Sequence, residues 1–132
     1  MSHLFLCRVY YEDTDLAGIV YYANYLKFIE RARTEWVRGL GIDQARLKDE
    51  TGIVFAVRRL EADYLAPARF DDELEVETAV ARIGGARIVL DQSVRRAGAD
   101  CFSARVTLAA LTGSGAPARL PADLRERLAA GA

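Results

Sequence analysis

The chain has 132 residues, 52% of them hydrophobic, and its 18 basic and 19 acidic residues leave a formal net charge of −1. This length predicts a single domain, residues 1–132, that is large enough to bury a core. A balanced charge gives no bulk electrostatic reason to bind nucleic acid, and no window approaches the ~18 consecutive apolar residues of a membrane span. We therefore expect neither nucleic-acid binding nor membrane insertion.

The N-terminal third predicts a strand, a turn and a long helix. Residues Leu4–Glu12 alternate apolar side chains on one face, which is typical of a strand with that face buried. A turn follows over Asp13–Gly18. From Tyr22 to Leu40 the apolar residues recur at spacings of three and four, so this segment is predicted to be a helix with a wide apolar face.

The rest of the chain predicts mainly strands. Asp43 is placed to cap a short helix that runs through Glu50. Four strand-like runs follow, at Ile53–Leu65, Leu74–Arg82, Ala86–Arg95 and Cys101–Leu111. Short turns, one of them at Gly84–Gly85, connect these runs and predict an antiparallel meander. Pro121–Ala130 predicts a short terminal helix.

These elements predict an α+β fold, with a curved five-stranded antiparallel sheet wrapped around the long central helix. An open sheet of five strands has two exposed edges, and proteins usually cover or pair such edges. We therefore expect a homodimer whose sheets join edge to edge, or a homotetramer built from two such dimers.

The residue inventory removes several kinds of chemistry. The only histidine, His3, lies beside the N-terminus, where residues are seldom held in place. A Ser–His–Asp or Cys–His catalytic arrangement therefore lacks its base, and no zinc-ligand cluster or phosphate-binding glycine loop is present. Cys7 and Cys101 are interpreted as small buried apolar residues in a reducing cytoplasm. We expect no metal and no cofactor, so catalysis has to use carboxylates, hydroxyls and backbone dipoles.

Two carboxylates, Asp13 and Asp15, stand where the first strand gives way to the long helix. Free amides at a helix start can bind a developing oxyanion, and a carboxylate can attack an acyl group or activate water. Aspartate is also favoured in turns and helix caps. A turn-forming or pairing role is the interpretation preferred for Asp13.

The sequence resembles one known family over nearly the whole chain, from about Phe5 to Leu111. The resemblance rests on two segments: Tyr10–Tyr25, which contains the pattern D-x-D-x-x-G-x-V-Y, and Phe28-Ile-Glu-Arg-Ala-Arg-Thr-Glu. The chain resembles the hotdog-fold acyl-CoA thioesterases, most closely the YbgC-like, Tol–Pal-associated enzymes. The 4-hydroxybenzoyl-CoA thioesterases are a more distant group.

The resemblance implies that Asp15 is the catalytic carboxylate and that the backbone amide of Tyr22 polarises the thioester carbonyl. It also implies a site at a subunit interface, with coenzyme A along the partner's surface. Tyr22 stands where many YbgC-like proteins have histidine and the 4-hydroxybenzoyl-CoA enzyme has tyrosine. The residues leave open whether Asp15 is a nucleophile or a general base.

Other substrate contacts are predicted near the turn and the helix start, at Gly18, Val20, Tyr21 and Tyr25. The glycine can equally serve turn geometry, and tyrosines at this spacing are common in cores. Coenzyme A carries phosphates, which guanidinium groups bind well. Arg82 and Arg87, on either side of the Gly84–Gly85 turn, are the preferred candidates for that role.

Two alternative functions compete with thioester hydrolysis. A hotdog dehydratase or hydratase generally needs a histidine paired with a carboxylate, and the terminal His3 argues against it. A non-catalytic module could instead use the same cleft to bind acyl-CoA or an acyl-carrier protein.

Overall fold

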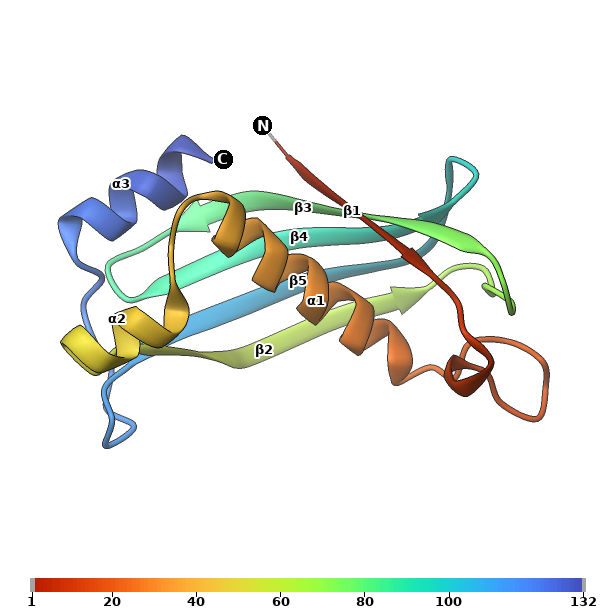
Figure 1. Cartoon of the computed structure of the whole chain (residues 1–132), viewed down its shortest axis with the longest axis horizontal. Helices are drawn as coiled ribbons and strands as arrows, with labels where there is room; N and C mark the ends of the chain where they lie inside the picture. The colour runs from red at the N-terminus through yellow and green to blue at the C-terminus, as the bar shows by residue number, and fades with distance from the viewer. Residues whose placement is uncertain (1, 132) are drawn as a thin grey trace.

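The computed structural model describes residues 2–131 as one five-stranded antiparallel sheet with a long helix packed across one face (Figure 1). The strands are β1 (His3–Arg8), β2 (Val54–Tyr64), β3 (Glu73–Ile83), β4 (Arg87–Arg96) and β5 (Ala99–Leu111). The helices are α1 (Asn24–Gly39), α2 (Gln44–Thr51) and α3 (Ala122–Ala130), with a 3-10 turn, η1, at Tyr11–Asp13. This is the predicted hotdog arrangement, and no helix among these residues has the length and apolarity needed to cross a membrane.

The strands lie in the order β1-β3-β4-β5-β2, and every neighbouring pair is antiparallel. The predicted meander is confirmed for β3, β4 and β5. The prediction was wrong in extending it to β2, which pairs with β5 at one edge of the sheet while β1 occupies the other. The reason is the connection after β2, which crosses the end of the sheet and bonds the β1–α1 loop, with the Val20 amide donating to Ala68 O at 2.8 Å.

The core lies between α1 and the face of the sheet on which it packs. The helix buries side chains that recur every three or four residues, as predicted: Tyr25, Phe28, Ile29, Ala32 and Trp36. The sheet supplies the opposing layer, which includes Leu74, Val76, Ile88, Leu90 and Val94. This packing buries the apolar stripe of the helix and fixes the position of its N-terminal end.

One polar group, Gln92, is buried within this interface. Its Nε2 donates to Ile29 O at 3.0 Å and to Thr78 Oγ1 at 2.9 Å, while Arg33 Nη1 donates to its Oε1 at 3.0 Å. Because the buried amide is bonded on both its nitrogen and its oxygen, it avoids the cost of an unpaired polar group and fixes α1 on the sheet.

Element boundaries differ slightly from the prediction. β1 ends at Arg8 rather than Glu12, since Tyr11–Asp13 turns into η1, and this leaves Tyr11 exposed. α1 begins at Asn24, two residues later than predicted. Asp43 caps α2 as expected, because its side chain accepts a hydrogen bond from the Arg46 amide.

The two cysteines are free thiols in the core or against it. Cys101 is buried and Cys7 is half-buried, which confirms their interpretation as small apolar residues. Burial raises the pKa of Cys7 to about 11. The thiolate is therefore scarce near neutral pH, and Cys7 is a poor nucleophile.

Candidate active site

Asp13 organises the loop between β1 and α1 through its side chain and its carbonyl. Its Oδ2 accepts the Tyr10 amide at 2.8 Å, and its carbonyl oxygen accepts both the Tyr21 amide and Asn24 Nδ2 at 2.9 Å. The residue is only 8% exposed. Asp13 thus has the structural role predicted for it: it ties the turn to the first residue of α1.

Asp15 is held by the turn that contains it but keeps one oxygen free. Its Oδ1 accepts the Ala17 amide at 2.9 Å, and its carbonyl accepts the Gly18 amide at 2.9 Å. The left-handed φ of Gly18, +80°, closes this turn and explains the glycine. Among residues 2–131, no donor bonds Asp15 Oδ2, so that oxygen is available to act as a base or a nucleophile.

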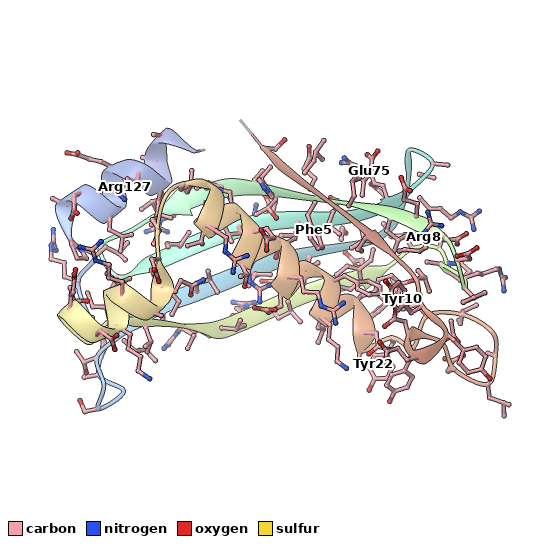
Figure 2. The ribbon with its side chains drawn as sticks, in the orientation of Figure 1. Phe5, Arg8, Tyr10, Tyr22, Glu75 and Arg127 are labelled. Atoms are coloured by element: carbon pink, nitrogen blue, oxygen red, sulfur yellow. The ribbon has the colours of Figure 1, made fainter. Side chains whose placement is uncertain are left out.

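The Tyr22 amide is oriented by the peptide group to which it belongs. That peptide's carbonyl, Tyr21 O, accepts the Asn24 amide at 2.8 Å in the first turn of α1. The N–H and C=O of a trans peptide point in opposite directions, so the Tyr22 N–H is directed away from the helix. It has no acceptor within residues 2–131. Figure 2 shows Tyr22 at the start of α1, at the same end of the molecule as Tyr10.

A cavity of about 410 Å³ joins these groups. It is lined by residues of the β1–α1 loop, the start of α1 and the end of β2: Asp15, Ile19, Val20, Tyr21, Tyr22, Tyr25, Tyr64, Leu65, Ala66 and Pro67. The structure therefore brings together five predicted site residues, and Gly18 lies outside the lining. Tyr64 and the segment after it were not anticipated, because they reach the site only through the position of β2.

Tyr64 and Tyr25 connect this cavity to the core. The Tyr64 hydroxyl donates to Tyr22 O at 3.0 Å, across the gap between β2 and α1. The Tyr25 ring stacks on Phe102 with centroids 5.1 Å apart and an interplanar angle of 9°, and the Tyr64 ring meets both rings edge-on. Burial raises the pKa of both tyrosine hydroxyls, so both remain protonated at neutral pH.

Arg82 and Arg87 lie in a second cleft, away from Asp15. This arginine cleft has a volume of about 630 Å³ and is lined by Arg58, Arg59, Arg82, Gly84, Arg87, Val89 and Thr107. Tyr64 and Arg58 are six residues apart on β2, which corresponds to roughly 20 Å along a strand. The predicted phosphate-binding residues and the predicted catalytic residues are therefore separated within one protomer.

Two β-bulges build the arginine cleft. The register shifts between Val80 and Arg82 on β3, and between Val57 and Arg59 on β2. After these shifts Arg82 pairs with Val89, Val89 pairs with Thr107, and Thr107 pairs with Arg59. The four residues form one row across four strands, so the bulges place the two arginines on the same face of the sheet.

The geometry of the Asp15 cavity suits acyl-group hydrolysis by a carboxylate. In the part of the chain that the structure describes, no three His, Cys, Asp or Glu side chains come together as a metal site. A free carboxylate oxygen such as that of Asp15 can act as a base or nucleophile, and a free backbone amide such as that of Tyr22 can bind an oxyanion.

Comparison with known proteins agrees with this chemistry. The family model described as Thioesterase superfamily matches residues 17–101. The chain belongs to the thioesterase superfamily. The match begins at residue 17 and so does not include Asp15.

Comparison with individual proteins narrows the family from the thioesterase superfamily to the acyl-CoA thioesterases. The chain is 49% identical over 92 residues to the acyl-CoA thioesterase YbgC of Haemophilus influenzae, covering 70% of this chain and 68% of that protein. It is 46% identical over 87 residues to the acyl-CoA thioester hydrolase YbgC of Escherichia coli, covering 66% and 64%. A probable thioesterase from Bartonella henselae superposes with a TM-score of 0.87 at 36% identity, over 92% of this chain and 100% of that one. The predicted acyl-CoA thioesterase family is confirmed.

Proposed function

We propose that this thioesterase hydrolyses acyl-CoA in the Asp15 cavity, with Asp15 as the catalytic carboxylate and the Tyr22 amide as the oxyanion donor. One observation carries the proposal: a carboxylate oxygen and a backbone amide, both without partners among residues 2–131, line the same cavity. The amide lies at the start of a sixteen-residue helix, whose dipole favours negative charge there.

Asp15 can serve this reaction by either of two routes. As a general base, it takes a proton from water, hydroxide adds to the carbonyl carbon, and the C–S bond breaks to release CoA thiolate, which is then protonated. As a nucleophile, Oδ2 attacks that carbon and the C–S bond breaks to leave a mixed anhydride. Water then adds to the Asp15 carboxyl carbon, so the acid leaves with the enzyme's own oxygen. A single turnover in ¹⁸O water separates the routes, since solvent oxygen in the first product indicates the general base.

Asp15→Asn tests the proposal with little structural disturbance. Asparagine keeps the side-chain oxygen that accepts the Ala17 amide, so the turn is preserved while the charge is lost. We expect kcat, followed by thiol release from a panel of acyl-CoAs, to fall about 10²–10⁴-fold at an unchanged Tm. Wild-type kcat in this variant would refute the role of Asp15.

The edge strand β2 supports the predicted homodimer. It is eleven residues long and has a strand neighbour on one side only, and its last eight residues are exposed. Val57, Leu60 and Tyr64 are among the exposed large hydrophobic residues. Antiparallel pairing of two β2 strands would cover this edge. Light scattering would measure the dimer, and would also show whether two dimers form the predicted tetramer.

The same pairing would bring the arginine cleft of one protomer to the proposed site of the other. Antiparallel β2 strands run in opposite directions, so the Arg58 end of one protomer approaches the Tyr64 end of the other. A CoA whose thioester lies at Asp15 would then place its phosphates near the partner's arginines. Arg82 and Arg87 suit this role because, within residues 2–131, neither makes an ion pair. Guanidinium groups bind phosphate strongly and in a defined geometry.

A cytoplasmic location is a further part of the proposal. Cys7 and Cys101 are both free thiols, as is usual in a reducing compartment. Cell fractionation followed by immunoblotting would measure it.

A further inference from the structure

Tyr25 has a hydrogen-bonding capacity that the fold leaves unused. The residue is only 3% exposed, yet it lines the Asp15 cavity. Its hydroxyl oxygen accepts the Ala68 amide at 3.1 Å, but its proton reaches no acceptor among residues 2–131. Buried polar groups are nearly always bonded, so a buried donor without a partner beside a cavity indicates a ligand atom.

The surrounding rings hold the Tyr25 hydroxyl in place. Phe102 stacks on one face of the Tyr25 ring, while Phe28 and Tyr64 meet it edge-on with centroids at 6.0 and 5.7 Å. Because the Ala68 amide occupies one lone pair of the Tyr25 hydroxyl oxygen, the O–H bond points away from Ala68. The proton is thus presented by a rigid ring.

Exposure places Tyr25 at the floor of the cavity. Tyr21 and Tyr22, which line the same cavity, are 45% and 61% exposed and form its rim. In the proposed reaction the thioester carbonyl meets the Tyr22 amide. The part of the substrate that extends from the carbonyl to the floor of the cavity, and so to Tyr25, is then the acyl group.

We propose that Tyr25 selects acyl groups that carry an acceptor oxygen beyond the thioester carbonyl. The hydroxyl donates to that oxygen, whereas a plain aliphatic acyl group leaves the buried donor unbonded. A site built to hydrogen-bond a substrate atom discriminates against an analogue that lacks it. This inference rests on the proposed function, because it assumes that the acyl group enters the Asp15 cavity.

Ether-for-methylene pairs of substrates test the inference cleanly. Methoxyacetyl-CoA matches butyryl-CoA in shape, and 3-methoxypropionyl-CoA matches pentanoyl-CoA, with the oxygen one position further along. An ether oxygen accepts hydrogen bonds but cannot donate. We expect the ether-to-methylene ratio of kcat/KM to be about tenfold higher for wild-type enzyme than for Tyr25→Phe in at least one pair. Comparing the two proteins cancels the inductive effect of the ether oxygen on the thioester carbonyl.

Tyr64→Phe is the matched control. It also removes a tyrosine hydroxyl from the cavity, but one whose proton is already bonded to Tyr22 O. Any loss of rate in this variant should affect both members of a pair equally and leave their ratio unchanged.

The outcomes distinguish this inference from the proposed function. An ether-to-methylene ratio that Tyr25→Phe leaves unchanged in both pairs overturns the role of Tyr25 while Asp15 keeps its own. Because phenylalanine also removes the acceptor of the Ala68 amide, Tm is measured in parallel. The ratio of two substrates on one protein sample is independent of how much of that sample is folded.

Discussion

The Asp15 cavity and the arginine cleft are built in different ways. The β1–α1 loop, which lines the cavity, and the β3–β4 turn, which lines the cleft, lie toward opposite ends of the sheet (Figure 1). Most of the cavity comes from one short stretch, in which hydrogen bonds within the β1–α1 loop fix Asp15 and the Tyr22 amide. The arginine cleft is assembled from four strands, with two shifts in register. A site local in sequence depends on its loop, whereas a site spread over a sheet depends on strand pairing.

The largest effect on stability should come from removing the residue that holds the loop together. Asp13→Ala deletes the acceptor of the Tyr10 amide, and we expect a loss of about 1–3 kcal/mol in the free energy of unfolding, measured in urea. Turnover should fall as well, since Asp13 also orders the approach to Tyr22. Asp15→Asn serves as the contrast, with lost turnover at wild-type stability. Equal stability of the two variants would contradict this division of roles.

A smaller effect is expected at the arginine cleft. Replacing Arg82 and Arg87 together by alanine should raise KM for acyl-CoA about tenfold, because two cations for the CoA phosphates are lost, and should leave kcat unchanged. An acyl-pantetheine substrate, which lacks the nucleotide, should show no change. Arg105→Ala is the control, since Arg105 is ion-paired with Asp91 outside the cleft. An equal rise in KM for both substrates would show that the arginine cleft does not bind the CoA phosphates.

The smallest expected effect is the different response of the two regions to ionic strength. The arginines of the cleft are exposed, so raising the ionic strength from 0.1 to 1 M, which shortens the Debye length from about 10 to about 3 Å, should raise KM for acyl-CoA about threefold. The kcat depends on groups that hydrogen bonds hold in place within the β1–α1 loop. These bonds are little affected by salt, so kcat should stay constant. A kcat that changes with salt at a constant KM would contradict this assignment of KM to the arginine cleft and kcat to the Asp15 loop.

The same difference explains what the sequence could and could not predict. The turn at Asp15, the helix that follows and the structural role of Asp13 all depend on neighbours within a few residues, and all were predictable. The convergence of Arg59 and Arg82 depends on two bulges that no local pattern marks. Tyr64 was missed for a related reason: only the pairing of β2 with β5 brings it to the start of α1.

That hydrogen bond from Tyr64 to Tyr22 O has a consequence for how activity depends on protein concentration. Tyr64 belongs to the proposed dimer edge and also holds the peptide that follows the oxyanion donor. Subunit association and catalysis are then thermodynamically linked through this hydroxyl as well as through the partner's arginines. Specific activity should decline on dilution into the range where the dimer dissociates, and Tyr64→Phe should weaken this dependence.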